Sequence, residues 1–100
     1  MTPRSQSPTD YSAIARRLRL TRMAAGYDDY GGQARFARRL NLGTGRWNNY
    51  ETGGDKPIPF KVALLVVQVT GATLDWIYLG DRSGLPQRLV TAIEKLERSE

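Results

Sequence analysis

The sequence predicts an all-α domain, and three observations support this prediction. Apolar residues recur at helical spacing in several segments, as Phe36, Ala37 and Leu40 do. Glycines such as Gly26 and Gly71 follow these segments, at the position where helices commonly stop. No segment shows the pattern of a strand. A length of 100 residues, 40% of them hydrophobic, suits one small domain with tails.

The first nine residues, MTPRSQSPT, are rich in Ser, Thr, Pro and Gln, and we expect residues 1–9 to form a disordered N-terminal arm. Arg4 could follow a phosphate or a groove, and an idle tail is the other interpretation. Thr9 or Asp10 can cap a helix predicted from about Tyr11 to Ala25. Its inner stripe is predicted to hold Ile14, Ala15, Leu18 and Met23.

Four arginines cover the rest of this predicted helix: Arg16, Arg17, Arg19 and Arg22. Two interpretations stay open for them, a solvated face or one or two side chains lying along a DNA backbone. Gly26 ends the helix, and the segment GYDDYGG at 26–32 is predicted to be a loop. Its two acids would repel a nearby phosphate, so we expect the loop to point away from DNA.

The segment from Phe36 to Gly53 predicts a short helix, a tight turn and a second short helix from about Thr44 to Glu51. Asn41 tolerates the left-handed conformation that ends a helix, and Leu42 is placed to fill the gap between the two helices. Trp47 and Tyr50, three residues apart, should face the core. The outer face then carries Thr44, Gly45, Arg46, Asn48 and Asn49, which suits contact with base edges and phosphates.

After this segment, a turn-rich connector from Gly54 leads to Pro59, which suits the start of a helix that reaches about Thr70. We expect Phe60, Ala63, Leu64 and Val67 to build the core from this helix, with Leu65 and Val66 as further candidates. Thr73 can cap the next short helix, TLDWIYL, and Gly80 closes it. In that helix Leu74, Ile77 and Tyr78 or Leu79 are predicted to turn inward, and Trp76 is interpreted as a core or interface residue.

The C-terminal stretch from Leu85 to Arg98 shows an apolar stripe at helical spacing, which predicts an amphipathic helix. The stripe consists of Leu85, Leu89, Ile93 and Leu96. Such a helix can fold back on the domain or pair with a second copy of the chain, and the sequence leaves both possibilities open.

Charge is unevenly distributed along the chain. The formal net charge is +5 and the pI is about 10.0. Residues 1–56 hold ten Lys or Arg and five Asp or Glu, whereas residues 57–100 hold five of each. The excess lies in the half that contains the two short helices, a distribution typical of nucleic-acid binders. A merely soluble basic surface is the alternative.

Several classes of function are disfavoured by composition. The chain has no Cys and no His, so a metal site, a disulfide and the usual catalytic bases and nucleophiles are not expected. We therefore expect neither enzymatic activity nor a cofactor. No apolar run approaches the roughly 20 residues of a membrane span, and the segment MTPRSQSPTD has no apolar core of the signal-peptide kind. We expect a cytoplasmic protein; a bacterial or phage source and association with the nucleoid are implied only by the family resemblance described next.

Taken in order, these features resemble the Cro/XRE-type helix-turn-helix family of phage repressors. The resemblance rests on Ala37, Leu40, Asn41 and Leu42, on a helix that ends in Tyr-Glu-x-Gly, and on the later segment VTGATLDWIYLGD. It implies a five-helix lambda-repressor-like domain at 10–81, with helices two and three as the motif. Residues 82–100 would add a C-terminal helix for packing or dimerisation.

The resemblance implies sequence-specific binding of double-stranded DNA by a transcriptional regulator, expected to be a repressor, with the helix at about 44–51 in the major groove. Thr44 and Asn49 would read bases, and Arg46 would compensate for Gly45, which reads nothing. The backbone contacts would come from Gln33, Asn48 and Lys56. A homodimer on a near-palindromic operator is expected, with contacts from helix five and the C-terminal helix. The alternatives are a protein-interaction module of the same fold that has lost DNA binding, or an antitoxin.

Overall fold

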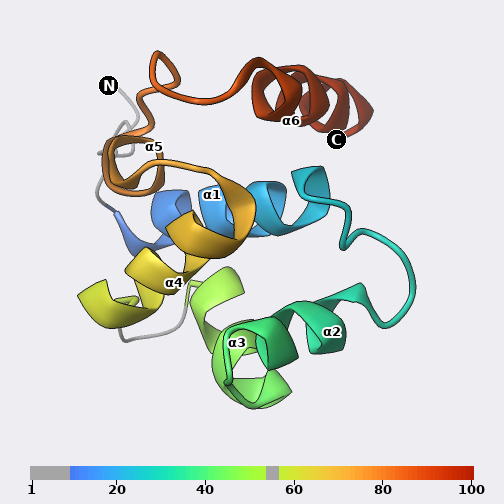
Figure 1. Cartoon of the computed structure of the whole chain (residues 1–100), viewed down its shortest axis with the longest axis vertical. Coiled ribbons are helices and arrows are strands. Elements are labelled where there is room, and N and C mark those ends of the chain that lie inside the picture. Colours follow the sequence, from blue (N-terminus) through green and yellow to red (C-terminus); the bar gives the residue numbers. More distant parts are fainter. Residues whose placement is uncertain (1–9, 54–56) are drawn as a thin grey trace, which may run out of the picture.

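The computed structural model describes residues 10–53 and 57–100, and this part of the chain forms six helices and no strand (Figure 1). The all-α prediction is therefore confirmed. The predicted arm at 1–9, with Arg4 and Thr9, and the predicted phosphate contact Lys56 lie outside the described residues. The helices are α1 (Tyr11–Ala24), α2 (Gly32–Arg39), α3 (Thr44–Glu51), α4 (Phe60–Thr70), α5 (Leu74–Leu79) and α6 (Gln87–Ser99).

Helix α1 is the centre of the molecule, and it contacts α2, α3, α5 and α6 (Figure 1). Ile14, Ala15 and Leu18 are buried as predicted, and Leu20 is buried on another side of the same helix. Asp10 occupies the position before the first turn, but its side chain makes no capping hydrogen bond. Because neighbours surround α1 on several sides, its buried surface is wider than one apolar stripe.

For two of the four arginines of α1 both interpretations are wrong, because Arg17 and Arg22 are buried within the protein. Arg17 Nε donates to the backbone oxygen of Ile77 at 2.9 Å, which ties α1 to α5. Burial lowers the pKa of Arg17 from its ordinary value. These side chains are therefore structural, and they are neither a solvated face nor DNA contacts. The stripe pattern could not show this, since it describes only the side of α1 with apolar residues.

The connection between α2 and α3 forms as the sequence predicts. Asn41 adopts a left-handed conformation with φ of 60°. The amide of Asn41 donates to the oxygen of Arg38 and the amide of Leu42 donates to the oxygen of Ala37, each at 2.9 Å. This pair of bonds satisfies the last carbonyls of α2 and reverses the chain direction. Leu42 is half-buried against the core, so the turn fixes how α3 is set against α2.

Helix α4 buries a different face from the predicted one. Ala63 is buried as expected, but Phe60 is 60% exposed and Leu64 is 37% exposed. Val66, a further core candidate, is buried, and Val62 and Thr70 are buried although they were not predicted. Lys61 and Gln68 lie seven residues apart and are both exposed, so they mark the outer face of α4. The prediction placed the inner face by the apolar residues alone and so assigned Phe60 and Leu64 to the wrong side. Among the described residues, no helix combines the length and apolar character needed to cross a membrane.

Helix α6 folds back on its own chain and packs beside α1 (Figure 1). Leu85, Leu89 and Ile93 are buried, and Leu96 packs against the core. Most of the apolar stripe is therefore covered by the chain itself. Ion pairs join the end of α6 to α1 and to the segment before α6: Arg16–Glu97, Arg16–Glu100, Arg19–Glu100 and Arg82–Glu97.

Candidate nucleic-acid interface

Helix α3 has one buried aromatic side and one exposed polar side. Trp47 is fully buried and Tyr50 is buried, as predicted. The ring of Trp47 lies edge-on to Phe36 at 5.0 Å between centroids and to Tyr50 at 6.3 Å. Aromatic pairs in such arrangements stabilise beyond the area they bury. The opposite side of α3 is open to solvent along its length, and it carries Thr44, Gly45, Arg46, Asn48 and Asn49.

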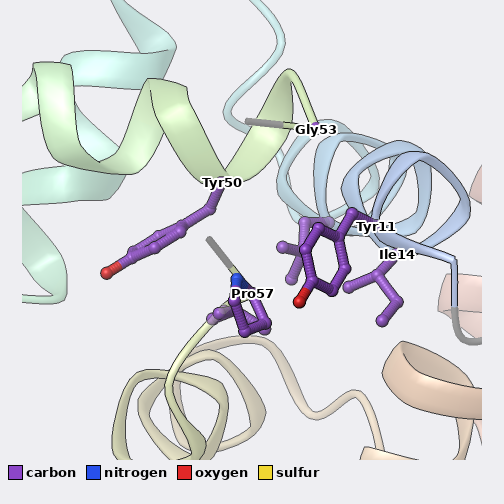
Figure 2. A pocket seen from close by; sticks show the side chains of 7 residues that line it. Tyr11, Ile14, Tyr50, Gly53 and Pro57 are labelled. Atoms are coloured by element: carbon purple, nitrogen blue, oxygen red, sulfur yellow. The ribbon is translucent and has the colours of Figure 1, made fainter. Parts of the chain in front are cut away.

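The C-terminal end of α3 is seated on α1. Figure 2 shows Tyr11 and Ile14 of α1 beside Tyr50, Gly53 and Pro57 around a small hollow. The hollow measures about 10 Å³, which is at the lower limit for one water molecule. It is therefore a packing seam between α1 and the end of α3, and it offers no room for a ligand.

Glu51, the one acid of α3, is held inside the protein by Arg22. Arg22 Nε donates to Glu51 Oε2 at 2.5 Å, and Arg22 Nη2 donates to Glu51 Oε1 at 3.3 Å. The indole N–H of Trp47 also donates to Glu51 Oε2. The side chain of Glu51 is 3% exposed and that of Arg22 is 11% exposed. The negative charge of the carboxylate is thus balanced by Arg22 and buried, so it does not repel an anion at the outer face of α3.

Sequence reasoning missed this buried pair, although one signal was present. Glu51 falls four residues after Trp47 and one after Tyr50, which places it on the buried stripe of a helix. An acid on such a stripe needs a cationic partner. The identity of that partner could not be read locally, because Arg22 comes from α1 and is 29 positions away in the chain.

Gln33 lies in the first turn of α2, the place that the resemblance assigns to it. Its Nε2 donates to Asn48 Oδ1 and to Glu51 Oε1, both at 3.1 Å. The structure therefore brings together Gln33 and Asn48, two residues expected at the DNA backbone. Both amide hydrogens of Gln33 are directed at side chains of α3 in this arrangement, whereas the Asn48 amide nitrogen keeps its own donors for an outside partner.

The three residues expected to read bases lie on the exposed side of α3. Arg46 Nε donates to the hydroxyl of Tyr50 at 3.2 Å, which holds the guanidinium along the helix surface. In the described part of the chain, no carboxylate forms an ion pair with Arg46. Thr44 begins the helix, and Asn49 follows more than one turn later. The residue before the helix, Gly43, has no side chain to cap the free amide groups of the first turn.

Comparisons with known proteins give no assignment for this site. No family model matches the chain, and neither the curated proteins nor the solved structures searched contain a match.

Proposed function

We propose that this chain binds double-stranded DNA and acts as a transcriptional regulator of bacterial or phage type, with α2 and α3 as a helix-turn-helix. In this proposal α1 to α5 form a lambda-repressor-like unit, and α3 lies in the major groove. One observation supports it most. Helix α3 anchors its back through Trp47 and Tyr50 while its polar face stays uncovered.

The electrostatics of the two helices support the same proposal. Arg38, Arg39 and Arg46 are exposed on α2 and α3. The one acid of these two helices, Glu51, is buried in its pair with Arg22. An anion that approaches α3 therefore meets arginines without a competing carboxylate from the same helices. Such unopposed positive charge is the sequence-independent part of DNA affinity.

Base reading would rest on a few side chains at the start and middle of α3. Asn49 can bond adenine through two atoms, Arg46 can reach guanine, and Thr44 can contact a thymine methyl or a base edge. The DNA backbone would be contacted by the Asn48 side chain and by the main-chain amide groups in the first turn of α2, where Gln33 lies. Lys56 remains a proposed phosphate contact from the sequence resemblance.

A homodimer on a near-palindromic operator is also part of the proposal, because one domain makes few specific contacts. Most of the apolar stripe of α6 is covered by its own chain, so α6 contributes less to such a dimer than the sequence implied. Leu79, at the end of α5, is 55% exposed and remains available for a contact between copies.

The test is a gel-shift measurement over a salt series with duplex DNA selected from a random pool. We expect Arg46→Ala and Asn49→Ala each to weaken binding to the selected sequence by about 1–3 kcal/mol. Arg98→Ala is the matched control for Arg46→Ala. It removes the same charge from an exposed arginine of α6, which lies across the molecule from α2 and α3 (Figure 1).

Equal losses for Arg46→Ala and Arg98→Ala would show that α3 is not the reading surface. A chain that binds no duplex DNA even at low salt would favour the second candidate, a protein-interaction module or antitoxin of this fold. Phe60 and Leu64, exposed at positions i and i+4 on one face of α4, would be the apolar contact residues of that candidate.

A further inference from the structure

A basic hollow lies on the side of α2 that faces away from the core. It measures about 360 Å³ and is lined by Tyr27, Arg35, Arg38 and Arg39. The three arginines occupy positions i, i+3 and i+4 of α2, so they share one helix face. Phe36 and Ala37 occupy the opposite, buried face. The hollow is largely open to solvent.

Positive charge in this hollow is only partly neutralised. Arg35 pairs with Asp29 at 2.6 Å. Within the described part of the chain, no carboxylate pairs with Arg38 or Arg39. The C-terminal end of α2 favours cations there, but three guanidinium groups around one hollow repel each other. A bound anion would relieve that repulsion.

Tyr27 adds a neutral donor to the hollow and is itself held in place. Arg39 Nη1 donates to the Tyr27 hydroxyl oxygen at 2.9 Å, which leaves the hydroxyl hydrogen for an incoming oxygen atom. The Tyr27 ring lies edge-on to Phe36 at 5.1 Å, and its backbone oxygen accepts from Arg22. A Cβ at Gly32 would lie 2.5 Å from the same oxygen, so glycine permits the close approach that seats the loop on α2.

From this geometry we propose that the hollow binds the phosphate groups of an anionic ligand. Guanidinium groups bind phosphate through paired, charge-assisted hydrogen bonds, and the arginines with the Tyr27 hydroxyl supply donors to several oxygens at once. The proposal does not depend on DNA recognition by α3. Two sources carry this chemistry, a soluble phosphorylated compound and the DNA backbone, and the experiment separates them.

Asp29 opposes the ligand in this arrangement. Its carboxylate holds Arg35 and would compete with a phosphate for the same guanidinium. Removing the negative charge with Asp29→Asn therefore frees Arg35. This change should strengthen phosphate binding, whereas removal of an arginine should weaken it. A general loss of structure would weaken phosphate binding in both kinds of variant, so opposite effects of the Asp29 and arginine substitutions would point to a direct electrostatic role.

The first arm measures pyrophosphate binding to the full chain without DNA, by calorimetry and by chemical-shift changes at Tyr27 and Arg35 to Arg39. We expect Arg38→Ala and Arg39→Ala each to weaken binding by roughly tenfold, and Asp29→Asn to strengthen it. Arg98→Ala, which removes an equal charge elsewhere, should leave it unchanged. Circular dichroism on each variant confirms that the helices are retained.

The second arm measures duplex DNA binding by the Arg38→Ala, Arg39→Ala double variant. If pyrophosphate binds and DNA affinity matches that of Arg98→Ala, the source is a soluble phosphorylated compound. The source is the DNA backbone if two results are found together. Pyrophosphate competes with DNA, and in the double variant the slope of the logarithm of the DNA-binding constant against the logarithm of the salt concentration becomes shallower by about two. The proposal is overturned if pyrophosphate produces no shifts at the hollow, or if Arg98→Ala weakens its binding as much as Arg38→Ala does.

Discussion

At the scale of single residues, the Arg22–Glu51 pair contacts both the buried Trp47 and, through Gln33, the exposed side of α3. The pair lies under α3, and Glu51 accepts hydrogen bonds from Arg22, Trp47 and Gln33. A buried charge with one partner removed is costly, because the remaining charge has lost both water and its counter-charge. The same bonds hold Trp47 and, through Gln33, the outer residue Asn48.

We predict that Glu51→Ala lowers the free energy of unfolding by about 3–5 kcal/mol, since it leaves Arg22 buried without its partner. Urea denaturation followed by tryptophan fluorescence measures the change. Glu94→Ala, which removes an exposed acid from α6, is the control and should change stability by less than about 0.5 kcal/mol. A double variant with methionine at both 22 and 51 should recover part of the loss. Equal stability of Glu51→Ala and Glu94→Ala would contradict the structural role of the pair.

At the scale of the helix, α3 is short and its first turn is weakly specified. Gly45 lies inside the helix, where glycine is less favourable than alanine because its backbone loses more freedom. Gly43 precedes the helix and supplies no capping side chain. We therefore expect the backbone of Thr44 to Arg46 to be loosely ordered in the free protein, and the proposed DNA complex to order it. Amide exchange with and without DNA tests this, and equal protection in both states would disprove it.

We predict that Gly45→Ala raises the free energy of unfolding by about 1 kcal/mol. A Cβ built at Gly45 meets no atom within 4 Å, so the substitution introduces no clash. Gly53→Ala is the contrasting control, because Gly53 has φ of +74° and a Cβ there would lie 3.4 Å from Ser12 Cα. It should destabilise the protein. Thermal unfolding of both variants compares them directly, and a loss of stability in Gly45→Ala would argue that α3 is distorted at this position.

At the scale of the whole molecule, ion pairs at the end of α6 connect it to α1 and to the segment after α5. Glu97 accepts from Arg82 at 2.9 and 2.6 Å and from Arg16 at 3.3 Å. The hydrogen bonds from Arg82 hold the pKa of Glu97 below its ordinary value of 4.5. A carboxyl group with a lowered pKa in the folded state stabilises that state above its unfolded pKa, and this stabilisation is lost as the pH falls through the folded pKa.

We predict that Glu97→Gln lowers the free energy of unfolding by about 1 kcal/mol at pH 7, a modest value because the arginines are partly exposed. The difference from the unsubstituted protein should shrink below pH 4.5 and disappear once Glu97 is protonated in the folded state. Urea denaturation at a series of pH values measures it. Glu94→Gln is the control on the same helix. A difference that persists unchanged at acid pH would show that Glu97 acts through packing and not through its charge.

The sequence by itself determined the elements of this protein. Helical spacing, the left-handed tolerance of Asn41 and the glycines that end segments place all six helices within a few residues of their observed bounds. The buried back and exposed polar side of α3 follow from the same spacing, because Trp47 and Tyr50 are neighbours on a helix surface. These features depend on residues that are close in the sequence, so they can be predicted from the order of residues along the chain.

Only the tertiary structure decided the features that join distant parts of the chain. It buried Arg17 and Arg22, turned Phe60 and Leu64 of α4 outward, and placed α6 against α1. It also brought Tyr27 of the loop to the arginines of α2. Lys61 and Gln68 indicate the outer side of α4, but the neighbouring helices decide which of its many apolar side chains are covered. A charged side chain is buried only where a partner from elsewhere in the chain meets it. Which residues meet is a property of packing in three dimensions, and no local spacing encodes it.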